Sequence, residues 1–180
     1  MSNIAEIFSS KHCLQVIRQF LYKPYVEKYQ TEVVKESGLA YLTAVKCLNS
    51  LVSGSLLIES WKGGLKIYSL NRDSPVVKHL KILLDVSTIY ESVKGFAGQS
   101  FELYIFGSAA RGEDTEDSDV DMLIVGTIDE RILVDITKKL ASVIGRKVNP
   151  LVKSPIEFAE LSRTNAAFYE SITRDRIRIL

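Results

Sequence analysis

Residues 101–126 read FELYIFGSAARGEDTEDSDVDMLIVG, in which two short apolar runs flank a Gly-Ser pair, one arginine and many acids. Apolar runs of about four to eight residues that are bounded by turn residues are typical of buried strands. We therefore expect strands over residues 103–106 and 122–125, with a turn at Gly107-Ser108 after the first. The rest of the chain can be placed around this pair of strands.

Two carboxylates, those of Asp119 and Asp121, stand two residues apart where the second run begins. Because strand side chains alternate between faces, both should point the same way while Val120 points into the fold. Two carboxylates on one strand face near a Gly-Ser turn suit a hard divalent cation that carries a polyphosphate. The alternative is an acidic loop without a metal. The pair predicts a metal and polyphosphate site, whereas the neighbouring acids are expected in a solvated loop: Glu113, Asp114, Glu116 and Asp117.

The composition is that of an ordinary folded protein, with 46% hydrophobic and 25% charged residues among 180. No apolar run approaches the roughly 18–20 residues that a membrane span needs, and the first residues lack the pattern of a signal peptide. Cys13 and Cys47 fall within apolar helical patterns, so we expect buried thiols rather than a disulfide. We therefore expect a cytoplasmic protein that does not bind a membrane.

The N-terminal part predicts three helices and a hairpin, the latter from the pair Gly63-Gly64. Residues 1–75 carry nine Lys and Arg against six Asp and Glu, a mild bias that permits contact with nucleic acid. The expected elements are a helix that begins at Lys11, a helix capped by Thr31 that ends at Gly38, a helix over residues 41–53, and strands over residues 56–60 and 65–70.

This order of elements resembles a winged helix-turn-helix domain over about residues 8–72. The resemblance implies that the helix over residues 41–53 enters the major groove of double-stranded DNA. Winged helices also serve as protein-binding and dimerising modules, and one cation on this helix is a modest DNA surface. A homodimer is therefore one possible form of the protein. The implied DNA-binding residues are Tyr41, Thr43, Lys46, Asn49 and Ser50 on the helix, with Lys62 and Lys66 on the wing.

A connecting helix is expected after Ser74-Pro75, an N-cap followed by proline at the first helical position. Its apolar stripe continues to about Lys94, which makes it a spacer or a dimerisation surface. We divide the chain into an N-terminal domain (1–73), this helix (74–98) and a C-terminal domain (99–180). The C-terminal domain adds a helix over residues 129–144, a strand over 147–152, helices over 154–161 and 166–172, and a strand over 177–180. The sequence predicts a mixed α+β fold with a small mixed sheet.

The C-terminal domain is similar to the minimal nucleotidyltransferases of the DNA polymerase β superfamily. The similarity covers about residues 100–180 and rests on the pattern Gly107-Ser108-x-x-Arg111-Gly112 followed by Ser118-Asp119-x-Asp121. It implies a polymerase-β-like fold that transfers a nucleoside monophosphate from a nucleoside triphosphate to a hydroxyl group. It further implies that Asp119 and Asp121 are catalytic and hold Mg²⁺ (or Mn²⁺), and that Gly107 and Ser108 bind the phosphates. Arg111 would neutralise phosphate charge or pair with the acids.

One position departs from the family pattern, because Asn149 stands where active members carry a third carboxylate on a later strand. An amide ligates a metal weakly and cannot take a proton from a nucleophile. Glu157 is a nearby acid, but it lies in an expected helix. Two interpretations therefore remain. The chain is an active enzyme, or it has an impaired transferase domain and acts as a transcriptional regulator or as an antitoxin-like protein that pairs with a helical toxin-like partner.

Overall fold

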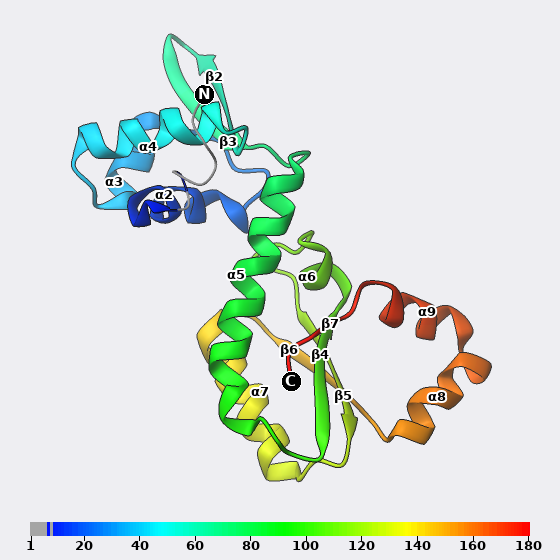
Figure 1. Cartoon of the computed structure of the whole chain (residues 1–180). Coiled ribbons are helices and arrows are strands. Elements are labelled where there is room, and N and C mark those ends of the chain that lie inside the picture. Colours follow the sequence, from blue (N-terminus) through cyan, green and yellow to red (C-terminus); the bar gives the residue numbers. More distant parts are fainter. Residues whose placement is uncertain (1–6, 8) are drawn as a thin grey trace. The chain divides into compact units, whose positions relative to one another are not determined.

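The computed structural model describes residue 7 and residues 9–180, which form a mixed α+β fold with two small sheets, as the sequence predicts (Figure 1). The chain divides into two compact units, Met1–Lys78 and His79–Leu180. Within the described residues, no helix is both long enough and apolar enough to cross a membrane.

Three helices form the body of the N-terminal unit: α2 (Lys11–Leu21), α3 (Gln30–Ser37) and α4 (Tyr41–Ser53). The Ser10 side chain caps α2 by accepting the backbone N–H of Cys13 at 3.4 Å. Apolar side chains at helical spacing face one another and are fully buried, so they form the core of the unit. They include Val16, Ile17, Phe20 and Leu21 of α2 and Leu48 and Leu51 of α4.

The start of α3 differs from the expected one, since Tyr29 and not Thr31 is its N-cap. The carboxylate of Glu32 accepts the backbone N–H of Tyr29 at 2.7 Å. This bond satisfies a donor that would otherwise be left over at the helix start, and it lets α3 begin earlier. Gly38 ends the helix with a φ of +62°, as expected.

A three-stranded antiparallel sheet completes the N-terminal unit, in the order β1-β3-β2. Its strands are β1 (Lys28–Tyr29), β2 (Leu57–Lys62) and β3 (Leu65–Leu70). Gly63 and Gly64 have φ values of +58° and +78°, which a two-residue hairpin turn requires. Because these glycines make the whole turn, β2 extends to Lys62 instead of ending near Ser60 as expected.

The C-terminal unit is built on a four-stranded mixed sheet in the order β6-β5-β4-β7. Its strands are β4 (Phe101–Phe106), β5 (Val120–Gly126), β6 (Val148–Lys153) and β7 (Ile177–Arg178). β5 runs parallel to β6, and the other two pairs are antiparallel. Pro150 lies in the edge strand β6, the position that proline tolerates because it lacks a backbone N–H.

Helices cover both faces of this sheet (Figure 1). Leu103 and Ile105 of β4 face α5 and α7, whereas Tyr104 between them packs with Phe158 of α8 and Ile172 of α9. The alternation of apolar side chains along β4 thus fills two cores at once. The helices are α5 (Pro75–Val93), α6 (Gly107–Arg111), α7 (Glu130–Ile144), α8 (Pro155–Thr164) and α9 (Ala166–Asp175), with a 3₁₀ turn over Lys94–Phe96.

A buried charge network joins α5 to the acidic loop and to the start of β6. Asp114 Oδ1 lies 3.1 Å from Lys81 Nζ, and Asp114 Oδ2 accepts a hydrogen bond from Arg146. Arg146 also donates to the carbonyl of Thr115 at 3.2 Å and pairs with Asp85 at 3.4 Å. All four charged side chains are at most 6% exposed. The expectation of a solvated Asp114 is therefore wrong, because two cations compensate its burial, whereas Glu113, Glu116 and Asp117 are exposed as expected.

We expect Asp114→Ala to destabilise the C-terminal unit by about 3–5 kcal/mol, because removing one member of a buried ionic network leaves its partners uncompensated. Urea unfolding of the full chain measures this change. Asp117→Ala is the matched control, since this exposed acid lies in the same loop and should change stability by no more than about 0.5 kcal/mol. Equal effects of the two substitutions would contradict the compensation of Lys81 and Arg146 by Asp114.

Candidate functional site

Three polar side chains meet at one end of β5 and β6. Asp119 precedes β5 and Asp121 is its second residue, while parallel pairing places Asn149 of β6 directly beside Asp121. Val120 between the two aspartates is buried, so both carboxylates lie on the same side, as the alternation predicts. Asp121 shares its strand face with Leu123, which packs in the core formed with α8 and α9. The site therefore lies on that face of the sheet.

A single amide group bridges the two carboxylates. Asn149 Nδ2 donates to Asp119 Oδ2 at 2.9 Å and lies 3.5 Å from Asp121 Oδ1. The register of β5 and β6 thus brings Asn149 beside the two aspartates. Because an amide NH₂ group is a neutral donor, it brings the two anions together without cancelling their charge.

Gly107 is fitted closely against Asp121. Its φ is +71°, a left-handed conformation that side chains with a Cβ rarely adopt. A Cβ built at this position would also lie 2.6 Å from Asp121 Oδ2. The glycine is therefore required both for the turn and for the space that the carboxylate fills. Ser108 follows it as the second residue of α6 and is half-buried.

The charge of Asp119 is stabilised by its neighbours. The hydrogen bond from Asn149 lowers the pKa of Asp119, and the ammonium group of Lys147, 3.4 Å from Asp119 Oδ2, lowers it further. Asp119 is accordingly ionised at neutral pH. The sequence patterns did not lead us to expect Lys147 at this site. Its spacing of two residues from Asn149 could have indicated it, because that spacing puts both side chains on one side of an extended segment.

The donor set fits one hard divalent cation. Two carboxylates are oxygen ligands of the kind that Mg²⁺ accepts, and Mg²⁺ commonly retains waters at its other positions. The Asn149 amide turns its NH₂ group toward these carboxylates, so its oxygen would join them only after the amide rotates. Within the part of the chain that the structure describes, no group of three or more His, Cys, Asp and Glu side chains is placed to hold a metal. The neutral amide of Asn149 thus leaves this site with less negative charge than a set of three carboxylates.

Two further residues considered from the sequence are engaged elsewhere. Arg111 Nε lies 2.8 Å from Glu113 Oε2, and its Nη1 lies 3.5 Å from Asp175 Oδ2, so it pairs with acids, which was one of its two expected roles. Glu157 accepts the backbone N–H of Ser154 at 2.8 Å and caps α8. That bond lowers the pKa of Glu157. Its carboxylate serves the helix start instead of joining the two aspartates.

The residues expected to bind DNA are distributed unevenly over α4. Tyr41, Lys46 and Asn49 are exposed, whereas Thr43 and Ser50 are half-buried. Thr43, Lys46 and Ser50 line a cavity beside α2. Lys46 and Asn49 are three positions apart and are therefore neighbours on the helix surface, whereas Tyr41 lies five positions before Lys46.

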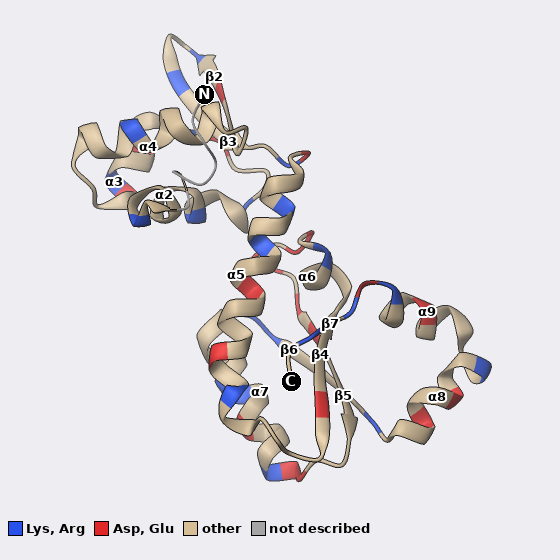
Figure 2. Cartoon of the chain, viewed as in Figure 1, with Lys and Arg blue, Asp and Glu red and all other residues tan. Residues whose placement is uncertain are grey.

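The cations expected on the wing are paired with acids. Lys66 Nζ lies 3.0 Å from Glu59 Oε1, and Lys62 Nζ lies 3.8 Å from Glu27 Oε2. Figure 2 shows both signs of charge along the hairpin of β2 and β3. The hairpin is therefore less positive than its lysines alone suggest.

Comparison with known proteins places the site within a matched segment. Residues 86–179 match the family described as nucleotidyltransferase domain. A candidate protein adenylyltransferase of Methanocaldococcus jannaschii is 34% identical over 80 residues, which are 44% of this chain and 78% of that protein. The crystal structure of a candidate nucleotidyltransferase from Sulfolobus solfataricus is 26% identical, covers 57% of this chain and 83% of its own, and has a TM-score of 0.32.

We expect Gly107→Ala to disturb the site beyond its effect on the backbone. A residue with a Cβ in the left-handed region costs about 1–2 kcal/mol, and at Gly107 the Cβ must also displace the carboxylate of Asp121. Gly145→Ala is the matched control, because Gly145 has a φ of +72° with open space around it. Urea unfolding and Mn²⁺ titration of both variants measure the two effects. Equal loss of Mn²⁺ affinity in both would contradict the close fit of Gly107 against Asp121.

Proposed function

Because the chain belongs to the nucleotidyltransferase domain family, we propose that its C-terminal unit binds a nucleoside triphosphate with Mg²⁺ and transfers the nucleoside monophosphate to a hydroxyl group. The observation that supports this most directly is the convergence of Asp119 and Asp121 beside Gly107. Two carboxylates beside a glycine turn suit a metal-bound polyphosphate better than a free anion, for which carboxylate oxygens offer no hydrogen-bond donor.

Each residue has a distinct part in the proposed reaction. Asp119 and Asp121 would hold Mg²⁺ or Mn²⁺, which when bound neutralises phosphate charge and polarises the reacting phosphoryl group. Gly107 would let the turn lie against Asp121, which would bring a metal-bound phosphate close to the turn. The Ser108 hydroxyl would donate a hydrogen bond to a phosphate oxygen. Arg111, held by Glu113 and Asp175, would turn to the phosphates only by giving up those acids.

Asn149 limits the rate of the proposed transfer. The acceptor oxygen attacks the α-phosphorus, the bond to the β-phosphate breaks, pyrophosphate leaves, and the hydroxyl proton must go to a base. An amide has no basic atom for that proton, so it passes to water or to one of the two aspartates. General base catalysis typically contributes about 10²–10⁴-fold, so we expect slow transfer by this chain.

The acceptor proposed is a hydroxyl group on a protein. The support is the relative from Methanocaldococcus jannaschii, which is named as a candidate protein adenylyltransferase and aligns with 78% of its own length. Transfer from ATP to a serine, threonine or tyrosine hydroxyl is the corresponding reaction for this chain. If transfer is absent, the same site serves a nucleotide-responsive regulator or an antitoxin-like protein with a small helical partner.

We expect Asp121→Asn to weaken binding of Mg²⁺-ATP by at least about 10–100-fold. Loss of an outer-shell partner of a metal ligand typically costs that much, and Asp121 would be a direct ligand. Asn149→Asp should raise the rate of transfer by about 10²–10⁴-fold, because it supplies a base and a third negative ligand. Calorimetry measures binding, and labelling of a cell extract with each α-labelled nucleoside triphosphate measures transfer. Asp117→Asn, an exposed acid of the same loop, is the control. Unchanged binding and labelling across all these variants would exclude the proposed site.

We further propose that the N-terminal unit is a winged-helix head that binds double-stranded DNA. The order of its three helices and antiparallel hairpin supports this, as do Tyr41, Lys46 and Asn49 exposed on α4. The pairing of Lys62 and Lys66 with acids leaves few cations for phosphate, which favours a dimer that doubles the contact surface.

We expect Lys46→Ala to weaken DNA binding and to reduce the salt dependence of the affinity by about one ion per protomer, since one phosphate contact is lost. Selection of genomic fragments followed by titration at several salt concentrations measures this. Lys35→Ala, an exposed lysine in the last turn of α3, is the matched control. Failure of the full chain to enrich any fragment over a chain that lacks residues 1–75 would assign the unit to protein binding instead.

A further inference from the structure

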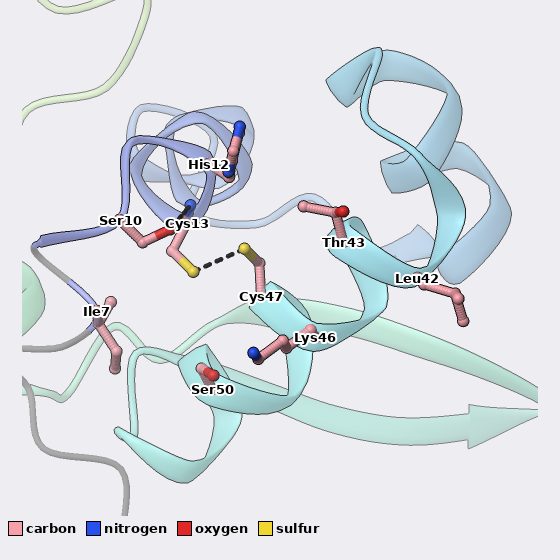
Figure 3. Close-up of a pocket in the computed structure, with 9 residues that line it drawn as sticks. All are labelled: Ile7, Ser10, His12, Cys13, Leu42, Thr43, Lys46, Cys47 and Ser50. Carbon is pink, nitrogen blue, oxygen red and sulfur yellow. Dashed lines mark hydrogen bonds between the residues drawn. The ribbon is translucent and has the colours of Figure 1, made fainter.

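Two cysteines that are distant in sequence lie against each other in the N-terminal unit. Cys13 of α2 and Cys47 of α4 are free thiols whose sulfur atoms are 2.7 Å apart. A disulfide bond is about 2.05 Å long, so the two sulfurs need to approach by less than about 1 Å to bond. Both side chains already point toward each other from packed helices (Figure 3).

A cavity gives small molecules access to this pair. Its volume is about 580 Å³, and both cysteines form part of its wall (Figure 3). Cys13 and Cys47 are 6% and 4% exposed, so both residues are largely shielded from bulk solvent. Ser10, His12, Thr43, Lys46 and Ser50 line the same cavity together with the apolar Ile7 and Leu42. Its wall is therefore mainly apolar, with one cation and several polar residues among its lining.

We propose that Cys13 and Cys47 form a site of reversible oxidation by a low-molecular-weight disulfide that enters this cavity. One cysteine attacks a sulfur of the small disulfide, forms a mixed disulfide with it and releases one small thiol, which takes up the proton that the cysteine lost. The second cysteine then attacks the protein sulfur of the mixed disulfide, forms the Cys13–Cys47 bond and releases the second small thiol. Two protein thiols are oxidised and one small disulfide is reduced, so atoms and electrons balance.

The environment favours a slow but directed reaction. Burial, together with the neighbouring Cys13 thiol, raises the pKa of Cys47 to about 12, so Cys47 is protonated at neutral pH. The contact between the two sulfur atoms places them for the second, intramolecular step. The reaction needs an excess of oxidant and does not depend on the nucleotide site.

The bond would link α4 to α2 at Cys47, the residue that follows Lys46. The two cysteines are 34 positions apart, and a link that closes such a loop restricts the unfolded chain and stabilises the folded one. It also removes the freedom of α4 to shift against α2. This site thus goes beyond the proposed activity, and it stands whether or not α4 binds DNA.

Incubation of the full chain with excess oxidised glutathione tests the proposal. We expect an intact mass lower by two hydrogen atoms, a peptide pair that joins Cys13 to Cys47 within one chain, and reversal by dithiothreitol. The oxidised wild type should melt at a higher temperature than the reduced wild type, a comparison that needs no variant. Cys13→Ser and Cys47→Ser should each fail to lose two hydrogen atoms.

Three results would overturn the proposal. They are an unchanged mass after oxidation, a cross-link between two chains instead of within one, and a lower melting temperature of the oxidised protein. Blocking by iodoacetamide after oxidation gives an independent measure, because the reduced and unfolded chain takes up two carbamidomethyl groups and the oxidised and unfolded chain should take up none.

Discussion

The contact among Asp119, Asp121 and Asn149 is the interaction around which the C-terminal unit is arranged. Asp119 and Asp121 stand on the same side at the start of β5, and the amide of Asn149 donates to Asp119 and lies 3.5 Å from Asp121. The ammonium of Lys147 also pairs with Asp119. Gly107 leaves room for the carboxylate of Asp121. The sheet register, the glycine turn and the start of β6 all serve to keep these charges together.

The buried charge network places the loop that delivers Asp119 to this site. Asp114 is held by Lys81 from α5 and by Arg146, which immediately precedes Lys147. The loop and the start of β6 are thereby fixed to each other on one side by an ionic contact, and on the other by the hydrogen bond between Asn149 and Asp119. A buried ionic group is expensive to desolvate, and its gain here is the position of a loop rather than added stability.

Much of this arrangement followed from residue patterns, because the relevant rules are local. The alternation of a strand placed Asp119 and Asp121 on one side, whereas the position of Asn149 beside them follows only from the parallel pairing of β5 and β6. Other features depend on contacts that no local pattern encodes. Asp114 looks like any loop acid until Lys81 and Arg146 surround it. We predicted the wrong start for α3. The side chain of Glu32, and not a hydroxyl group at Thr31, accepts the backbone N–H of Tyr29 at the start of the helix.

The two outer strands of the C-terminal sheet differ from its central pair in a way that affects association. β7 is only two residues long, and β6 carries Pro150, which offers no backbone N–H to a neighbour. Short edges and prolines are the devices by which β-proteins avoid recruiting a further strand from another molecule. This sheet is therefore poorly suited to grow by strand addition. Both of its edge strands, β6 and β7, disfavour the edge-to-edge pairing that leads to aggregation.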